Sequence, residues 1–180
     1  MTNKPTYLIF DLDYTLFDTD QLKRLVGHIT TVDARIFNQT QINRLKTKKI
    51  TENLLFHGVI DQLLRLKSKG YHLLIQTEGD QKGQQWKIDH TGLGAVIPKQ
   101  SQYIYWNKKI SYLNEIIDNI PKDAKVYYFD DKPTKLRAIK RHHPKILTVL
   151  VCQGPWWHLK LTDFTPDYTI KTIQEIERFL

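Results

Sequence analysis

The stretch from Tyr7 to Thr19, YLIFDLDYTLFDT, constrains the fold more than any other part of the chain. It opens with four apolar residues, a short run that predicts a buried strand. Asp11 and Asp13 follow at once, and the hydroxyl of Thr15 comes next. Carboxylates this close to a buried strand are costly unless a cation or a reaction requires them. The stretch is therefore either a polar exit from a strand or part of a functional site.

The rest of the chain alternates between apolar runs and helical patterns joined by short links. Such alternation predicts an α/β fold, a Rossmann-like parallel sheet with helices on both faces. Further strands are expected at 71–75, 95–97, 103–106, 126–129 and 146–151, and helices at 21–29, 58–69, 81–90, 107–120, 133–141 and 171–180.

Residues 19–56 break this alternation, because they show short helical patterns and no strand. The segment is too long for a simple connection and too poor in apolar residues for a core of its own. We therefore predict an α/β core from 1–18 and 57–180 and a small helical cap insertion at 19–56. Between residues 21 and 57 there are seven basic residues and two acidic ones, which accounts for +5 of the net charge of +8.

Composition excludes several classes of protein. The 41% of apolar residues is typical of a globular domain. No apolar run approaches the roughly 20 residues that cross a bilayer, and the N-terminus lacks the apolar region of a signal peptide. Cys152 is the only cysteine, and the histidines lack ligand spacing, so neither a disulfide nor a zinc site is expected. We expect a soluble, cytoplasmic protein without a membrane partner.

Polar groups follow three of the predicted strands at the same end. Thr77 and Gly79 follow the second strand, and Asp130 and Asp131 follow a later one, as Asp11 and Asp13 follow the first. In an open α/β sheet, ligands bind outside the carboxyl ends of the strands. These groups should therefore meet at one edge of the sheet, where they suit phosphate chemistry.

In this arrangement the chain resembles the haloacid dehalogenase-like (HAD) hydrolase superfamily. FDLDYTLF at 10–17 matches the first motif of that family, LLIQTEGD at 73–80 the second, a lysine near 108–109 the third, and VYYFDDKP at 126–133 the fourth. Receiver domains use similar residues, but their acidic pair comes first and their phosphorylated aspartate lies mid-chain. The order of residues here excludes that class.

The resemblance implies a phosphatase with an aspartyl-phosphate intermediate. Asp11 would be the nucleophile, and Asp13 the acid and base that serves the leaving group and then the water. Thr77 and the backbone N–H of Glu78 would bind a phosphoryl oxygen. A lysine would stabilise the phosphate charge. Lys109 is preferred for that role, with Lys108 and Lys99 as alternatives.

The resemblance also implies a Mg²⁺ cofactor, held by Asp11, the backbone carbonyl of Asp13, and Asp130, with Asp131 binding through water or orienting the site. Two positions depart from the family pattern. Tyr14 stands where Gly or Asp is frequent, and Glu78 replaces a common Asn.

The expected substrate is a small phosphorylated metabolite. The sequence does not indicate which metabolite it is, nor the oligomeric state of the protein. Arg35, Arg44 or Lys46 of the cap would contact an anionic leaving group, unless they form a solvated basic face. Trp156 and Trp157 are expected to pack a loop over the core, with nucleobase stacking or a partner surface as the alternative. Competing functions are a phosphotransferase or mutase, and a non-catalytic binding module for which the basic charge leaves nucleic acid as a possible ligand.

Overall fold

The sheet has the parallel arrangement that the sequence predicts. The computed structural model describes residues 4–26, 42–43, 51–106 and 111–180. Its strands are β1 (Thr6–Phe10), β2 (His72–Glu78), β3 (Gln102–Tyr105), β4 (Lys125–Asp130), β5 (Leu147–Val151) and β6 (Tyr168–Ile170). They form one six-stranded sheet in the order β3-β2-β1-β4-β5-β6, and every neighbouring pair is parallel. The prediction of a Rossmann-like α/β fold is confirmed.

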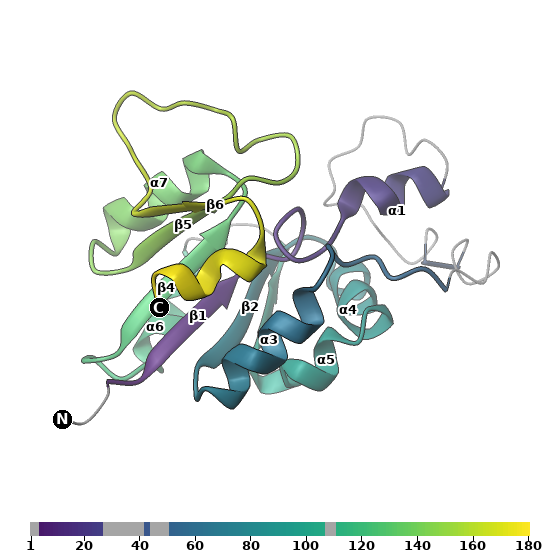
Figure 1. The fold of residues 1–180 in the computed structure, drawn as a ribbon, viewed down its shortest axis with the longest axis horizontal. Coiled ribbons are helices and arrows are strands. Elements are labelled where there is room, and N and C mark those ends of the chain that lie inside the picture. The colour runs from purple at the N-terminus through teal and green to yellow at the C-terminus, as the bar shows by residue number, and fades with distance from the viewer. Residues whose placement is uncertain (1–3, 27–41, 44–50, 107–110) are drawn as a thin grey trace.

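Helices cover both faces of this sheet (Figure 1). They are α1 (Thr19–Val26), α3 (Val59–Ser68), α4 (Gln81–His90), α5 (Leu93–Val96), α6 (Leu113–Asp118) and α7 (Pro133–His142), with short 3-10 helices η2 (Lys99–Ser101) and η3 (Ile173–Arg178). The buried side chains of α3, α4, α5 and η3 pack on one face, and those of α6 and α7 on the other. Helix α1 lies beyond the carboxyl ends of the strands (Figure 1).

The central strand β1 divides its side chains between two hydrophobic clusters. Leu8 and Phe10 belong to one cluster and Ile9 to the other, as the period of two along a strand requires. Phe10 stacks on Phe129 of β4 with ring centroids 4.6 Å apart. Since both faces are covered, these last three residues of β1 are fully buried. This explains why the strand is a continuous apolar run in the sequence.

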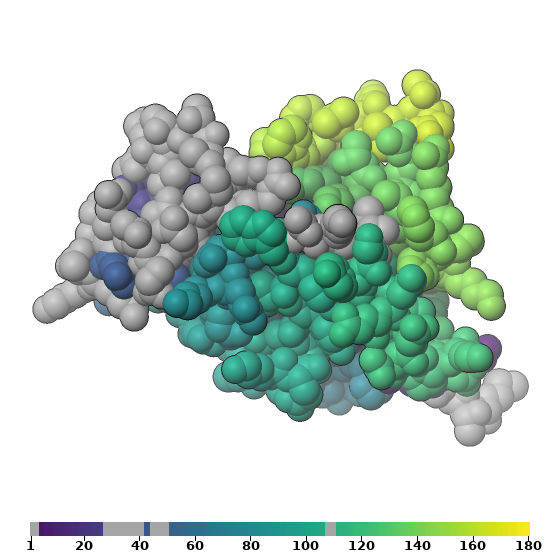
Figure 2. Space-filling model, turned by 180° about the vertical axis from the view of Figure 1, so that it is seen from behind, coloured from purple at the N-terminus to yellow at the C-terminus, as the bar shows by residue number. Residues whose placement is uncertain are grey.

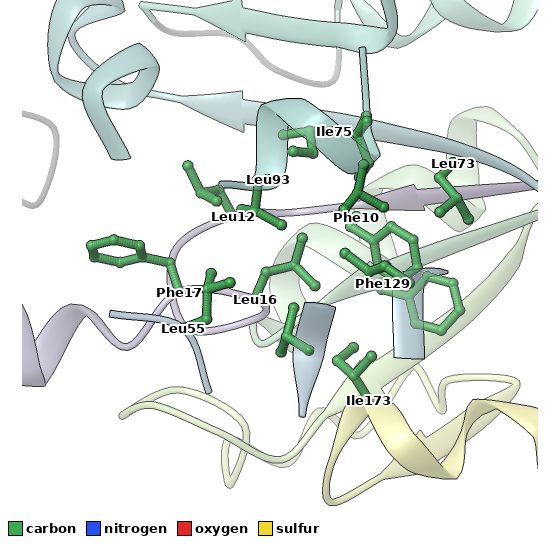
Figure 3. Packing of buried hydrophobic residues seen from close by; sticks show 14 of the residues in the cluster. Phe10, Leu12, Leu16, Phe17, Leu55, Leu73, Ile75, Leu93, Phe129 and Ile173 are labelled. Atoms are coloured by element: carbon green, nitrogen blue, oxygen red, sulfur yellow. The ribbon is translucent and has the colours of Figure 1, made fainter. Parts of the chain in front are cut away.

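The apolar residues after β1 anchor the loop that carries the first motif. Leu12, Leu16 and Phe17 are fully buried, and Figure 3 shows them in the same cluster as Phe10 and Leu55. The alternation of aspartates with apolar residues therefore fixes the loop on the core while its polar residues remain at the edge of the sheet.

The segment that follows this loop begins and ends at one place. The backbone N–H of Asp18 donates to the carbonyl of Leu54 (2.8 Å), and that of Phe56 donates to Leu16 (3.1 Å). The chain thus leaves and rejoins the core side by side, which is the geometry of an insertion. Residues 27–41 and 44–50 lie outside the described residues, so the cap at 19–56 stays a prediction.

Several local predictions were wrong. No strand forms at 95–97, because residues 95 and 96 belong to helix α5, in which Leu93 and Val96 are buried, and Ile97 follows the helix end. The helix predicted at 171–180 is the shorter 3-10 helix η3, and the strand β6 that precedes it was not predicted. Helix α1 begins at Thr19 rather than at 21, and Asp18 caps it by accepting from the N–H of Gln21 (2.8 Å).

The connection from β5 to β6 projects from the body of the protein (Figures 1 and 2). It carries Trp156 and Trp157, which are 46% and 41% exposed. The expectation that these two side chains pack over the core is therefore wrong. Among the described residues, no helix combines the length and apolar character needed to cross a membrane.

Candidate active site at the carboxyl edge of the sheet

Strand register brings three of the predicted carboxylates together. Phe10 of β1 pairs with Phe129 of β4, and the N–H of Asp11 donates to the carbonyl of Phe129 (2.9 Å). Asp11 and Asp130 therefore leave the two neighbouring strands at the same level and on the same face. One carboxylate oxygen from each of Asp11, Asp130 and Asp131 lies within 4.8 Å of the others, and all three residues are buried.

This set of donors fits a hard divalent cation. Three buried carboxylates at such separations repel one another unless positive charge lies between or beside them. Carboxylate oxygens are the ligands that Mg²⁺ and Ca²⁺ prefer. Asp11, Asp130 and Asp131 are accordingly the residues that could hold a metal ion, and the side chain of Asp13 is not one of this group.

The carboxylate of Asp13 is held by other side chains. Its Oδ1 accepts from Thr19 Oγ1 and Lys87 Nζ, both at 2.6 Å, and its Oδ2 accepts from Gln84 Nε2 at 2.9 Å. Burial alone would raise the pKa of Asp13, but the charge of Lys87 and these three hydrogen bonds outweigh burial, so the pKa lies below its usual value. These contacts therefore stabilise the ionised form of Asp13.

The turn after Asp13 places Tyr14 in the left-handed backbone region, which glycine adopts without strain. The carbonyl of Leu12 accepts from the N–H groups of both Leu16 and Phe17 (3.0 and 2.9 Å), which closes a tight turn. Within this turn Tyr14 has a φ of 60°. A left-handed backbone costs a residue with a Cβ roughly 1–2 kcal/mol, so the Tyr14 side chain must make contacts that offset the strain.

The contacts of Tyr14 join the loop to two other segments. Its hydroxyl donates to Asp20 Oδ1 (2.7 Å) and accepts from Lys23 Nζ (2.5 Å), both on α1. Its ring packs against Gly154, where a Cβ would come within 2.5 Å of the ring. Burial, followed by the Asp20 contact, raises the pKa of the Tyr14 hydroxyl. The departure from the family pattern thus links the first motif to α1 and to the loop after β5.

The second predicted motif lies at the end of β2. Thr77 is buried within the strand and Glu78 is its last residue. The carboxylate of Glu78 accepts from Lys135 Nζ of α7 at 2.7 Å. The residue that replaces the common Asn therefore forms an ion pair with the helix that follows the fourth motif.

The lysine of the third motif is not located, because Lys108 and Lys109 lie outside the described residues. The alternative Lys99 was wrong as a candidate. It belongs to η2, which directly precedes β3, and therefore lies at the amino end of the strands, opposite the aspartates. The basic cap residues Arg35, Arg44 and Lys46 also fall outside the described part of the chain.

Sequence reasoning missed Lys87 and Gln84. Both lie on the buried face of α4, three residues apart, together with Gly83 and Ile88. This helix buries polar side chains where an ordinary amphipathic helix buries apolar ones. The sequence signal for them was that Gln84 and Lys87 lie on the same face of the predicted helix as the apolar Ile88. It went unused because the partner, Asp13, is 74 residues away from Lys87 in the sequence.

Comparisons with known proteins identify the fold. No family model matches the chain, and the sequence matches no curated protein. Among solved structures, a protein of Burkholderia xenovorans LB400 assigned as a haloacid dehalogenase-like hydrolase is 20% identical, with a TM-score of 0.72 over 98% of this chain and 97% of that one.

Two further structures show the same likeness. YfnB of Bacillus subtilis, assigned as a HAD-hydrolase and solved with bound magnesium, is 15% identical, with a TM-score of 0.70 over 98% of each chain. A protein of Clostridium difficile assigned as a phosphatase is 16% identical, with a TM-score of 0.71 over 98% of this chain and 99% of that one. At these identities the likeness shows the fold. The chain has the fold of HAD-like hydrolases.

Proposed function

We propose that this chain, whose fold is that of HAD-like hydrolases, is a Mg²⁺-dependent phosphomonoesterase that works through an aspartyl-phosphate on Asp11. The observation that carries the proposal is the separation of two kinds of carboxylate at one edge of the sheet. Asp11, Asp130 and Asp131 converge within 4.8 Å. The Asp13 side chain, two residues from Asp11, is held apart by Lys87, Thr19 and Gln84.

Mg²⁺ is the proposed cofactor because it prefers carboxylate oxygens and retains water ligands beside a phosphate. When bound, it would neutralise the charge that otherwise keeps a carboxylate away from a phosphate dianion. Asp11, Asp130 and Asp131 would hold it. The magnesium found in YfnB supports the choice of metal by analogy of fold.

In the first half of the proposed reaction, a carboxylate oxygen of Asp11 attacks phosphorus. The bond to the ester oxygen breaks, and Asp13 gives that oxygen a proton as the alcohol leaves. Asp11 suits the role of nucleophile because it is buried and its backbone is fixed by the hydrogen bond to Phe129. This limits the orientations that its carboxylate can adopt.

In the second half, water attacks phosphorus and its proton passes to Asp13, while the bond to Asp11 breaks and phosphate forms. Asp13 must be protonated for the first half and ionised for the second. Its contacts with Lys87, Thr19 and Gln84 favour the ionised form, which is the one that accepts a proton from water.

The remaining predicted roles complete the proposal. The hydroxyl of Thr77 and the backbone N–H of Glu78 would bind a phosphoryl oxygen, and Lys109 or Lys108 would stabilise the phosphate charge. The substrate would be a small phosphorylated metabolite, with the basic residues of the predicted cap near its leaving group. Replacing Arg35, Arg44 and Lys46 together should then raise KM for the true substrate and spare small generic esters.

Turnover of p-nitrophenyl phosphate with Mg²⁺ and with EDTA tests the proposal, followed by a panel of phosphate esters. Asp11→Asn should abolish turnover, and Asp130→Asn should abolish it and also weaken Mg²⁺ binding measured by calorimetry. Asp61→Asn, an exposed aspartate of α3, is the matched control and should change neither.

Two results would contradict the proposal. Absence of Mg²⁺-dependent turnover across the whole panel would remove the enzymatic function and favour a binding module. Transfer of phosphate to an added alcohol or sugar, with little free phosphate released, would instead assign a phosphotransferase.

A further inference from the structure

We propose that helix α4 sets the position of the Asp13 carboxylate, through the ammonium of Lys87 and the side-chain amide of Gln84. These two would be positioning residues, since they act on the reaction through Asp13. The inference rests on the proposed function, in which Asp13 transfers protons to and from the reacting oxygens.

The two contacts fix the orientation of the carboxylate as well as its place. Lys87 donates to Oδ1 (2.6 Å) and Gln84 donates to Oδ2 (2.9 Å), so each oxygen has its own donor on the same helix. Residues three apart on a helix lie on one face. A carboxylate held at both oxygens by one rigid face cannot rotate without breaking one of the bonds. Proton transfer depends on such geometry, because the donor must lie within hydrogen-bond reach of the oxygen.

The loop after β2 fixes α4 in turn. Asp80 caps the helix by accepting from the N–H of Gly83 (2.8 Å). Gln84 Nε2 donates a second hydrogen bond, to the carbonyl of Glu78 (3.1 Å). Gly79 has a φ of 153°, and a Cβ there would come within 2.5 Å of Gln84 Nε2, so the absence of a side chain lets the amide approach. The loop that follows Thr77 and Glu78 therefore also positions Asp13, through Gln84.

The burial of Lys87 argues that its ammonium has a function beyond packing. Lys87 is one of the largest fully buried side chains of the described residues, and its Nζ lies 5.3 Å from the centroid of the Phe17 ring. Apolar residues of similar volume replace buried ion pairs at little or no cost in stability. A pair buried beside a cluster of carboxylates is the kind of arrangement found at functional sites.

The test compares two esters that differ in their need for a proton donor. The leaving group of p-nitrophenyl phosphate departs as a stable anion, whereas that of n-butyl phosphate needs a proton. A general acid contributes about 10²–10⁴-fold to such a step. Because kcat/KM covers the reaction only up to loss of the first leaving group, it isolates the step in which Asp13 acts as an acid.

In Lys87→Met and in Gln84→Met we expect kcat/KM for n-butyl phosphate to fall at least about 10-fold, and that for p-nitrophenyl phosphate less than about 3-fold. Gln84→Met removes a neutral donor, so it changes the position of Asp13 without removing a charge. In an Asp13→Asn background, neither substitution should lower kcat/KM further. Lys82→Met, on the exposed face of the same helix, is the control and should leave both values unchanged.

Three results would overturn the inference while the proposed function stands. They are an equal loss of kcat/KM for the two esters, a further loss of kcat/KM in the Asp13→Asn background, and a gain in kcat/KM for n-butyl phosphate in Lys87→Met. Wild-type protein inactive towards both esters would overturn the proposed function and the inference with it. If circular dichroism shows that Lys87→Met is unfolded, the Gln84→Met result decides.

Discussion

Substitutions of Lys87 and Asp13 should have strongly non-additive effects on the free energy of unfolding, because the two side chains form a buried ion pair. Its two charged atoms are 2.6 Å apart, and the side chains are 1% and 12% exposed. At an effective dielectric constant of about 20, Coulomb's law gives an attraction of about 6 kcal/mol at this distance. Desolvation of the two ions offsets several kcal/mol of that attraction, so the pair as a whole adds little net stability.

The single substitutions are nonetheless expected to be costly. Removing one partner of a buried pair costs about 3–5 kcal/mol, because the other charge stays buried without compensation. Asp13→Asn should cost more than Lys87→Met, since the ammonium it leaves behind is the more deeply buried group. The double variant should lose less stability than the two single variants lose together. The difference, which is the coupling energy of the pair, should be at least about 3 kcal/mol.

The free energy of unfolding is measured by urea unfolding, followed by circular dichroism, for the wild type, the two single variants and the double variant. The pair Arg178–Glu175 is the control, because it has a similar distance of 2.7 Å but lies at the surface, with Arg178 73% exposed. Its coupling should stay below about 1 kcal/mol and weaken with salt. If the losses of unfolding free energy in Lys87→Met and Asp13→Asn add up to the loss in the double variant within about 0.5 kcal/mol, the two charges do not interact as the structure indicates.

Three further substitutions test other parts of the structure. Asp167→Asn should cost about 1–3 kcal/mol at pH 7. Burial alone would raise the pKa of Asp167, but its contacts with Lys140 and Thr148 hold it below the usual value. The difference in unfolding free energy between Asp167→Asn and wild type, measured by urea unfolding, should therefore shrink as the pH falls below about 3.9, the pKa of an unfolded aspartate. It should vanish once the pH is below the lower pKa of Asp167 in the folded protein. Gly79→Ala should lower the melting temperature, because the backbone strain costs about 1–3 kcal/mol and the new Cβ displaces Gln84; an unchanged value would contradict the contact. Leu63→Ala should cost about 2–5 kcal/mol in urea unfolding, since this residue of α3 is fully buried, and a cost below about 1 kcal/mol would place it outside the core.

Local sequence was sufficient to predict five of the six strands and most of the covering helices. The strand Tyr7–Phe10 is apolar at every position because both faces of the sheet are covered, and such a run is visible without any partner. Helix α7 begins with Pro133, as proline at the first turn predicts. Where a few residues decide between helix and strand, the prediction failed, as at 95–97, because short apolar runs do not distinguish the two periods.

The candidate site was predictable to the extent that its residues follow strands. Asp11, Asp13, Thr77, Asp130 and Asp131 could be placed at one edge because parallel strands put their carboxyl ends together. How the aspartates divide between a cluster of three and a separate Asp13 was not predictable in this way. Side-chain direction at the end of a strand depends on which donors and charges approach from elsewhere.

The sequence by itself determined that Asp11 and Asp13 leave a buried strand in a turn whose apolar residues anchor it to the core. Only the tertiary structure decided what holds Asp13. Lys87 and Gln84 belong to a helix more than 70 residues later, and no local pattern connects them to the first motif. A charge buried in a folded protein is stable only beside its partner, and the fold alone brings the partners together.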